Sequence, residues 1–429
     1  MNLLRQFDLY GISAFSLAFV LIQSLPTTTL FAQDIDILIK GGHVIDGKNE
    51  IDGIMDVAIT AGKISAVAQN ISASGAKRVV DADGMYVTPG LIDMHVHVYN
   101  GTDTDSYLAD ALGSLPPDGF TFRSGVTTVV DAGTSGWRNF REFKKQTIDQ
   151  SQTRVLAFIS IVGVGMRGRL HAQDLTDMDP ILTAYMIREY PDIIIGVKKH
   201  HHQGATFTPV ERAVEAGNIA KVPVMVDFGE HDPMLSIKTL FLEKLRPGDI
   251  FTHTYSYTRN RETVVDEEGK VKPFIFEAQN RGIIFDVGHG GGSLIWHQTI
   301  PSIVQGFLPD VISTDLHKWS MNDGMKDMTN TMSKFLNLDM TIQQVVHRAT
   351  NIPATVIQRP ELGNLSVGAE ADVAVLSIRE GEFGFLDSRG RKLMGSQKIE
   401  AELTIRAGRV VWDLNGISAK NWDEEPRKY

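Results

Sequence analysis

The 429-residue sequence contains no cysteine and no stretch in which lysine and arginine cluster. The first absence excludes disulfides, thiolate catalysis and a lipid anchor attached through cysteine. The second, with a formal net charge of −10, argues against a nucleic-acid partner, because neutralising phosphates requires clustered basic side chains. A phosphate-binding glycine loop, a dinucleotide fingerprint and a Ser-His-Asp nucleophile elbow are also missing. The partner we expect is a small-molecule substrate.

Long hydrophobic runs are scarce as well, and one lies near the N-terminus. Residues 11–25 are mostly apolar but too few to span a bilayer comfortably, and Ala32 stands where a signal peptidase could cut. We interpret residues 1–32 as a secretory signal peptide, with an uncleaved membrane anchor as the alternative. Cleavage removes Arg5 and Asp8, so the net charge stays at −10 and no stable membrane span is left. The expected location is periplasmic or secreted, in a bacterium.

The composition that is present is ordinary for a globular protein, with 42% hydrophobic and 22% charged residues. Short strand patterns separated by glycine turns fill residues 34–88, and similar patterns return in residues 361–415. Neither segment alone is long enough for a convincing core. We therefore expect the two chain ends to pair into one small composite β domain, followed by a tail at 416–429.

Residues 89–360 alternate buried-looking strands with helical stretches, which is the pattern of repeated βα units around a parallel sheet. Eight strands are expected, at 89–98, 125–133, 154–162, 193–198, 222–227, 249–253, 282–289 and 310–315. Helices are expected between them, at 140–151, 180–190, 209–220 and 273–281. The predicted fold class is α/β, a (β/α)8 TIM-type barrel inserted between the two parts of the composite β domain.

In such a barrel the active site lies at the carboxyl ends of the strands, so the polar residues that close strands are the candidates. On the first strand, alternation places the side chains of Asp93, His95 and His97 on one face, and two imidazoles so placed suit chelation of a divalent metal. The polar residues that close the later strands are Lys198, Asp227, His253, His289 and Asp315. Together these residues predict a metal site at the barrel mouth.

The motifs on these strands resemble those of the amidohydrolase superfamily. Residues 88–97, Thr-Pro-Gly-Leu-Ile-Asp-Met-His-Val-His, are similar to its opening metal motif, and residues 313–317, Ser-Thr-Asp-Leu-His, to its closing one. More narrowly, residues 196–198, 285–293 and 368–375 resemble the dihydroorotase-like group of amidohydrolase/deacetylase metallohydrolases. The resemblance covers nearly all of the chain after residue 33, with its motifs in the right order.

This resemblance implies a pair of divalent ions, usually zinc, bridged by a lysine that has reacted with carbon dioxide to form a carbamate. The implied metal ligands are His95, His97, carbamylated Lys198, Asp227, His253 and Asp315. Asp315 is also expected to accept the proton of the metal-bound water, whose hydroxide attacks the substrate, and to pass that proton to the leaving group. The neighbouring Lys199 is expected to face the helices.

The chain departs from the family pattern at the fifth strand, where Asp227 stands in place of the expected histidine. An aspartate can ligate a metal through oxygen, so a binuclear site survives, but its second metal is held by a harder and more anionic set. Such a set either favours manganese or iron or leaves the second site weak. His231, four residues on, is a candidate substitute ligand, although we prefer to interpret it as a loop residue.

Three further side chains are candidates for substrate binding. His289, in a glycine-rich segment, is a candidate catalytic hydrogen-bond donor to the substrate or to a developing oxyanion. Arg167 and Arg169 follow the third strand, where a guanidinium can bind a substrate carboxylate, although a surface position is the simpler interpretation of either one alone. The sequence leaves open whether His317 faces the site and which residue of the tract 200–202 lines the pocket.

The activity we predict is metal-dependent hydrolysis of an amide or ester bond, in the form of removing a small acyl group such as acetyl from an N-acyl or O-acyl small acid. Hydrolysis of a cyclic amide, as in dihydroorotases and hydantoinases, is the alternative activity. A non-catalytic barrel scaffold is the alternative outside catalysis. The sequence does not decide the substrate, the metal or whether the chain forms a homo-oligomer.

Overall fold

The computed structural model of the protein describes residues 35–423. The predicted signal peptide, residues 1–32, lies outside this range. Residues 35–423 belong to one compact unit, so the domain limits predicted at residues 88 and 360 stay predictions. Between residues 35 and 423, no helix is both long enough and apolar enough to cross a membrane.

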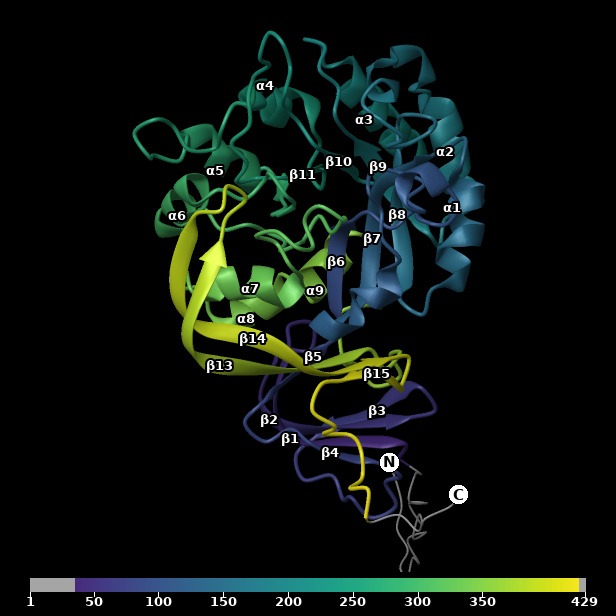
Figure 1. The fold of residues 1–429 in the computed structure, drawn as a ribbon, viewed down its shortest axis with the longest axis vertical. Coiled ribbons are helices and arrows are strands. Elements are labelled where there is room, and N and C mark those ends of the chain that lie inside the picture. The colour runs from purple at the N-terminus through teal and green to yellow at the C-terminus, as the bar shows by residue number, and fades with distance from the viewer. Residues whose placement is uncertain (1–34, 424–429) are drawn as a thin grey trace, which may run out of the picture. The chain divides into compact units, whose positions relative to one another are not determined.

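Seven strands form a parallel sheet in the order β12-β11-β10-β9-β8-β7-β6, which follows the chain without a break (Figure 1). They are β6 (Leu91–Val96), β7 (Val126–Gly136), β8 (Arg154–Ser160), β9 (Ile194–Lys199), β10 (Val224–Val226), β11 (Ile250–Phe251) and β12 (Ile284–Phe285). The parallel pairing confirms the predicted βα repeat. The last three strands are shorter than predicted, because their ladders end before the polar residues that follow.

The segment expected to form the eighth strand, residues 310–315, together with Leu316 after it, makes single pairings with both edges of this sheet. Val311 pairs in parallel with Asp286, just beyond β12, and Leu316 pairs in parallel with Val96 at the end of β6. The two edge strands are therefore bridged by one short segment.

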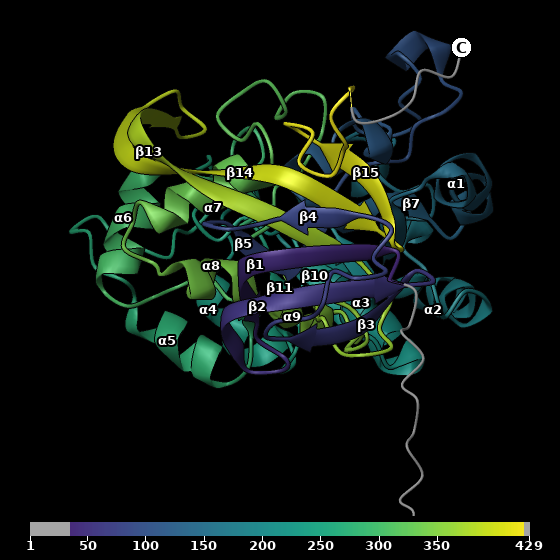
Figure 2. The ribbon, with the colours of Figure 1, turned by 90° about the horizontal axis from the view of Figure 1, so that it is seen from below.

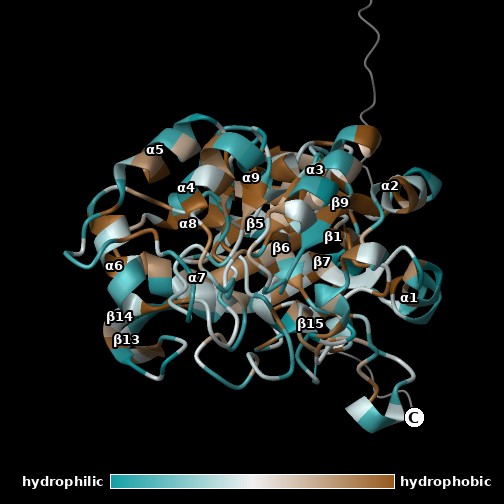
Figure 3. Ribbon diagram, turned by 90° about the horizontal axis from the view of Figure 1, so that it is seen from above, coloured by the Kyte–Doolittle hydropathy of each residue, from teal (hydrophilic) through white to brown (hydrophobic). Residues whose placement is uncertain are grey.

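One hydrophobic cluster draws side chains from β6 to β11 and from the bridging segment. Its fully buried members include Ile92, Met94, Val130, Ala132, Phe158, Met225, Ile250 and Val311. Because strands that are far apart in the sheet order contribute to one cluster, the sheet curls around it. A larger cluster packs the strands against the helices, and Figure 3 shows hydrophobic residues around β6 and β9 and hydrophilic ones on the outer turns of α1 and α2.

Helices follow the strands as the alternating pattern predicts. Their bounds are α1 (Phe140–Gln146), α2 (Pro180–Glu189), α3 (Thr208–Ala220), α4 (Ile237–Thr239), α5 (Pro273–Asn280), α6 (Trp296–Val304), α7 (Met328–Leu336), α8 (Ile342–His347) and α9 (Asn351–Val356). Local sequence explains their starts. Pro180 occupies the first turn of α2, where its missing N–H costs nothing, and the Asp179 carboxylate accepts hydrogen bonds from two first-turn N–H groups.

A second sheet is built from both ends of the described chain (Figures 1 and 2). Its path is β15-β14-β13-β5-β1-β2-β3, and β4 pairs with β1. The strands are β1 (Ile37–Asp46), β2 (Ile51–Thr60), β3 (Lys63–Ala68), β4 (Val79–Asp81), β5 (Tyr86–Pro89), β13 (Val373–Leu386), β14 (Lys392–Arg406) and β15 (Arg409–Asp413). Ala374 lies opposite Thr88 where β13 joins β5. This pairing confirms the prediction that the two chain ends share one sheet.

Strands β13 and β14 are much longer than predicted, and their far ends form a hairpin that reaches the helices beside the parallel sheet (Figure 1). The carboxylate of Asp387, in the hairpin turn, accepts a hydrogen bond from the backbone N–H of Trp296 at 3.2 Å. The Lys334 ammonium, on α7, donates to the carbonyl of Leu386 at 2.7 Å. The hairpin therefore holds the start of α6, which follows the glycine-rich segment 288–292.

Candidate metal centre

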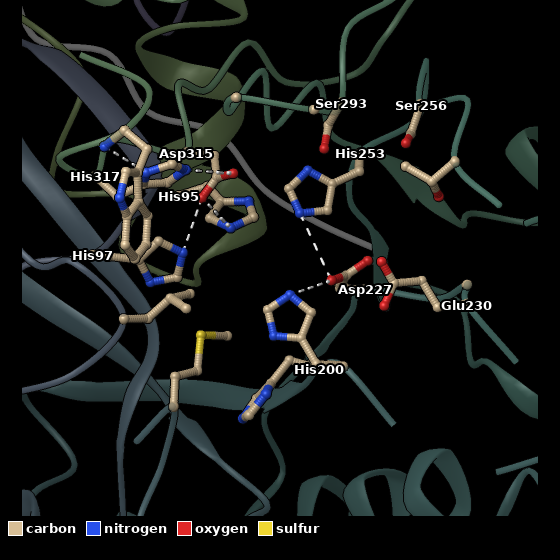
Figure 4. Close-up of a pocket in the computed structure, with 18 of the residues that line it drawn as sticks. His95, His97, His200, Asp227, Glu230, His253, Ser256, Ser293, Asp315 and His317 are labelled. Atoms are coloured by element: carbon tan, nitrogen blue, oxygen red, sulfur yellow. Dashed lines mark hydrogen bonds and ion pairs between the residues drawn. The ribbon is translucent and has the colours of Figure 1, made fainter. Parts of the chain in front are cut away.

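A cavity of about 410 Å³ lies where the parallel strands end. Residues predicted for the site that line it are His95, His97, Arg169, Lys198, Asp227, His253 and Asp315. Residues whose place the sequence left open also line it, namely His200, His201 and His317. Figure 4 shows these labelled imidazoles and carboxylates converging from different parts of the chain. The fold thus gathers at one cavity side chains that are more than 200 residues apart in the sequence.

His95, His97 and Asp315 form a buried group whose ligand atoms all lie within 4.8 Å of one another. Asp315 Oδ1 lies 2.9 Å from His97 Nε2 and 3.5 Å from His95 Nε2 (Figure 4). The backbone N–H of Asp315 donates to the carbonyl of His95 at 2.7 Å. Pairing of the bridging segment with β6 therefore places the carboxylate beside the two imidazoles.

The simple alternation expected for the first strand is not kept. The β6–β7 ladder shifts register between Asp93 and Val96. Asp93 is buried beside the bridging segment, where it accepts a hydrogen bond from the backbone N–H of Thr314 at 3.0 Å, and burial raises its pKa to about 7. The expectation that Asp93 shares a face with the two histidines is therefore wrong, because the register shift separates them.

The orientation of His95 is fixed by Thr252 and Asp286, which follow β11 and β12. Its Nδ1 lies 2.8 Å from Thr252 Oγ1, and the Thr252 hydroxyl donates in turn to Asp286 Oδ2 at 2.7 Å. Since the hydroxyl proton goes to Asp286, the Thr252 oxygen accepts from His95, and Nδ1 carries the imidazole proton. The lone pair on His95 Nε2 consequently faces the cavity. Burial is the main reason that the pKa of His95 lies well below its usual value.

Replacing Thr252 by valine removes this hydrogen bond while keeping the side-chain shape. Because such supporting partners set the tautomer of a ligating histidine, we expect metal affinity to fall roughly 10–100-fold. Competition between the purified variant and a chelator of known affinity measures the change. Unaltered affinity in Thr252→Val would show that the hydroxyl does not orient His95.

Asp315 stays ionised in this setting. Burial by itself raises the pKa of a carboxyl, but the imidazoles of His95, His317 and His97 outweigh that effect and hold the pKa of Asp315 well below its usual range. His317 Nδ1 accepts backbone N–H groups from Trp319 and Ser320 at 3.2 and 3.3 Å, so a neutral His317 carries its proton on Nε2. That Nε2 lies 3.8 Å from Asp315 Oδ2. His317 is thus placed to donate toward Asp315.

Lys198 is fully buried at the end of β9, with its Nζ 3.3 Å from His95 Nε2 and 3.3 Å from the Met225 sulfur. Burial lowers the pKa of its ammonium, although nearby carboxylates oppose the shift. Gly133, on β7, has its α-carbon so close that an added Cβ would lie 2.7 Å from the Cβ of Lys198. The absence of a side chain there makes room for Lys198.

Lys199 points away from the cavity and is also fully buried. Its ammonium donates to the backbone carbonyl of Asp227 at 2.9 Å and lies 5.3 Å from the ring centroid of Phe228. Burial lowers its pKa to about 8. Lys199 therefore supports the end of β10 rather than lining the site.

A second group surrounds Asp227. Its Oδ2 lies 3.5 Å from His201 Nε2 and 3.9 Å from His253 Nε2, while its Oδ1 accepts a hydrogen bond from Arg261 at 3.2 Å. Arg261 is buried and also donates to the carbonyls of Thr252 and His253 at 3.0 and 2.9 Å. Burial opposes ionisation of Asp227, but the neighbouring side chains of His253, His201 and Arg261 hold its pKa well below the usual value.

The backbone is strained at three of these residues. His201, His253 and Asp315 have φ values of +44°, +60° and +52°, in the left-handed region that residues with a Cβ rarely adopt. Each costs conformational energy that the surrounding fold must offset, and such residues cluster at functional sites. No pattern in the sequence predicted positive φ values at these three residues.

Two predicted substrate-binding residues are placed differently. His289 is fully buried, and its imidazole contacts the ammonium of Lys334; from its segment Gly291, Gly292 and Ser293 line the cavity instead. The direct substrate contact expected of His289 does not fit this position. Arg167 is exposed and outside the cavity lining, whereas Arg169 lies on the lining with its guanidinium 3.5 Å from Glu230.

The donor chemistry of the described residues fits a divalent cation. The Gly288 carbonyl accepts from His253 Nδ1 at 2.7 Å, so the lone pair of His253 Nε2 faces the carboxylate of Asp227, just as that of His95 faces Asp315. The buried Nδ1 of His97 has no hydrogen-bond partner among the described residues. Lone pairs that face carboxylate oxygens repel unless a proton or a cation lies between them.

A curled parallel sheet with imidazoles and carboxylates gathered at its strand ends is the architecture of a metal-dependent hydrolase. No family model matches the chain. It is 34% identical over 358 residues to a deacetylase of Agrobacterium fabrum, covering 80% of this chain and 83% of that protein. It is 30% identical over 385 residues to a deacetylase of Enterococcus faecalis, covering 88% of this chain and 99% of that protein.

Among solved structures, the chain is similar to an adenine deaminase with a TM-score of 0.79 and 30% identity, covering 89% of this chain and all of that one. The chain belongs to the amidohydrolase superfamily. The predicted resemblance is thereby confirmed, as is the prediction of a metal-dependent hydrolase.

Proposed function

We propose that the protein is a deacylase that removes a small acyl group, such as acetyl, from an N-acyl or O-acyl small acid. The observation that carries the proposal is the group formed by His95, His97 and Asp315 in a chain whose relatives over most of its length are named deacetylases. The proposed fold is a complete (β/α)8 barrel in which residues 310–315 act as the eighth strand.

The proposed cofactor is a pair of divalent ions, two Zn²⁺ with Mn²⁺ or Fe²⁺ as alternatives at the second site. The first is held by His95, His97, Asp315 and a carbamylated Lys198, and the second by the same carbamate, His253 and Asp227. Bound there, the ions would polarise the scissile carbonyl and acidify the attacking water. The low pKa of buried Lys198 favours the neutral amine that reacts with carbon dioxide.

Asp315 supplies the proton transfer. Its ionised carboxylate accepts a proton as water adds to the carbonyl carbon, and it returns that proton to the leaving nitrogen or oxygen when the single bond between that atom and the carbonyl carbon breaks. His317 Nε2, 3.8 Å from Asp315 Oδ2, orients the carboxylate during this exchange. Acetate and the free amino or hydroxy acid are the products.

The acid portion of the substrate is assigned to the arginine side of the cavity. Arg169 lies on the lining and is paired only with Glu230 at 3.5 Å among the described ion pairs, so its guanidinium can turn to a substrate carboxylate. Arg167, two residues away, is exposed and adds positive charge to the same loop. We assign His289 to holding the glycine-rich segment through Lys334, without contact to substrate.

A matched panel of substrates tests the proposal. The purified protein, supplied with Zn²⁺ or Mn²⁺, is assayed against N-acetyl amino acids, O-acetyl hydroxy acids and cyclic ureides, with release of acetate or ring opening as the readout. Hydrolysis of an acetylated acid, and loss of that activity after chelation, is the expected result. Less than one equivalent of metal with no hydrolysis across the panel would instead favour a non-catalytic scaffold.

Cyclic amide hydrolysis is the second candidate. A solved structure of a dihydroorotase is similar to this chain with a TM-score of 0.76 and 30% identity, covering 88% of this chain and 99% of that one. The same cavity and the same proton transfer serve ring opening. Turnover of the ureides without turnover of the acetylated acids would select this candidate.

A further inference from the structure

The fifth strand ends in Asp227, where the superfamily pattern predicts a histidine, so one imidazole is missing from the second metal site. Two histidines of neighbouring loops are candidates to replace it. His201 follows β9 and His231 follows β10. The contacts of the two imidazoles differ, and these contacts indicate which histidine can bind the second metal ion.

His201 lies on the cavity lining, and its Nε2 is 3.5 Å from Asp227 Oδ2. Its backbone has a φ of +44°, which lies in the left-handed region, two residues after β9 ends at Lys199. His200 also lines the cavity, but its Nε2 lies 2.9 Å from Ser160 Oγ, and no described ion pair joins it to Asp227. The turn at His201 is what presents one imidazole of this tract to the carboxylate.

His231 lies away from the cavity lining. It is buried, its Nδ1 donates to the carbonyl of Gly204 at 3.0 Å, and its ring packs on Phe228 with centroids 4.5 Å apart. Its Nε2 has no partner among the described residues, and the described ion pairs of Asp227 are with His201, His253 and Arg261 instead. The sequence suggested His231 as a candidate substitute metal ligand, but the structure favours His201 for that position.

We propose that His201 is a ligand of the second metal ion and takes the place of the missing fifth-strand imidazole. The site so defined consists of His201 Nε2, His253 Nε2 and Asp227 Oδ2, with Lys198 as the bridging residue. This inference rests on the binuclear function proposed above and names a ligand for it. The second site thus keeps two imidazoles, but one of them comes from the loop after β9 instead of from the end of the fifth strand.

The distances from Asp227 Oδ2 to the two imidazoles are close to those of shared ligation. Two ligand atoms bound at about 2.0–2.1 Å to one tetrahedral ion are separated by roughly 3.3 Å. Asp227 Oδ2 lies 3.5 Å from His201 and 3.9 Å from His253. The three ligand atoms do not meet the 4.8 Å spacing of the first group, so joint ligation requires the two imidazoles to rotate toward the carboxylate. Closer approach without an ion is unfavourable, since His253 presents a lone pair to the carboxylate.

Arg261 determines which oxygen of Asp227 is used. Its Nη1 donates to Oδ1 at 3.2 Å, and its Nη2 is anchored on the carbonyls of Thr252 and His253. Oδ1 is consequently occupied, and Oδ2 is left facing the two imidazoles. A monodentate carboxylate with one neutralising arginine carries less net charge than a free aspartate, which offsets the exchange of an imidazole for an anion.

The test measures metal content in His201→Ala, His201→Gln and His231→Gln, each purified with Zn²⁺ present and dialysed before elemental analysis. Because each ion depends on its own ligands, we expect about two equivalents in the wild-type protein and in His231→Gln, and about one in both His201 variants. Substitution with Co²⁺ gives a second readout, since loss of one site halves the visible absorption. Thermal melting of the apo-proteins shows that the variants fold.

The outcomes separate the two proposals. Two equivalents in both His201 variants, or loss of one in His231→Gln alone, would overturn the assignment of His201. A wild-type protein with one equivalent that still hydrolyses an acetylated acid would also overturn it, while leaving deacylation intact. A wild-type protein with neither metal nor activity would remove the proposed function itself.

Discussion

Lys198→Ala is expected to lose bound metal and hydrolytic activity together. The side chain is fully buried and lies 3.3 Å from His95 Nε2, between the two groups of candidate ligands. Because a Lewis acid contributes several kcal/mol to stabilising the transition state, we expect kcat/KM to fall by about 10³-fold or more. Elemental analysis and hydrolysis of the best substrate from the panel measure the two losses.

Lys199→Met is the matched control, since Lys199 is equally buried and adjacent in sequence. Methionine keeps most of the apolar stem but removes the hydrogen bond to the Asp227 carbonyl, for which the expected cost in stability is about 1–3 kcal/mol. Metal content and turnover should remain close to wild type. Equal losses in the two variants would overturn the assignment of the carbamate to Lys198.

A carboxylate supplied in solution probes the carbamate directly. Formate or acetate can enter the space left in Lys198→Ala and provide the missing pair of oxygens. We expect millimolar concentrations to restore part of the metal content and turnover of this variant, while the wild-type protein is unaffected. Absence of rescue together with full metal content would argue that Lys198 serves the site as an ordinary buried amine.

Asp315→Asn is expected to keep metal better than it keeps turnover. Asparagine retains one oxygen beside His97 Nε2 but cannot accept and return a proton, so kcat should fall by roughly 10²–10⁴-fold. The imidazoles hold the pKa of Asp315 well below its usual range, so its carboxylate is already ionised at neutral and mildly acidic pH. The size of the loss should therefore be constant across that range.

Asp310→Asn is the control for this substitution. Asp310 opens the same segment but accepts a hydrogen bond from the backbone N–H of Phe285 at 2.8 Å, away from the cavity. Turnover should be preserved there. Unchanged kcat in Asp315→Asn would remove Asp315 from the proton transfer, and a loss that grows steadily with falling pH would contradict its low pKa.

Much of the fold could be predicted from the sequence because hydrophobic periodicity reports local structure. The runs that form β6 to β9 are long and apolar, and glycine turns mark the strands at both chain ends. The composite sheet followed from the argument that neither end can bury a core alone, and Ala374 opposite Thr88 bears it out. The long β13–β14 hairpin was missed, since its outer half is exposed and lacks an apolar alternation.

Part of the site was also accessible from sequence. Polar residues that close parallel strands meet at one end of a sheet whatever their separation in the chain, which is why His95, Lys198, His253 and Asp315 were identified. That reasoning fails for residues in loops, because tertiary contacts rather than strand periodicity determine where a loop side chain points. His289 illustrates this failure. Its imidazole contacts the buried ammonium of Lys334 instead of lining the cavity.

The sequence by itself determined the family, the strand-end candidates and the departure at Asp227. Only the tertiary structure decided how that departure is accommodated. Arg261 occupies one oxygen of Asp227, and a left-handed turn brings His201 within 3.5 Å of the other. Neither contact is encoded in a local pattern, because each depends on loops from different strands meeting over the same cavity.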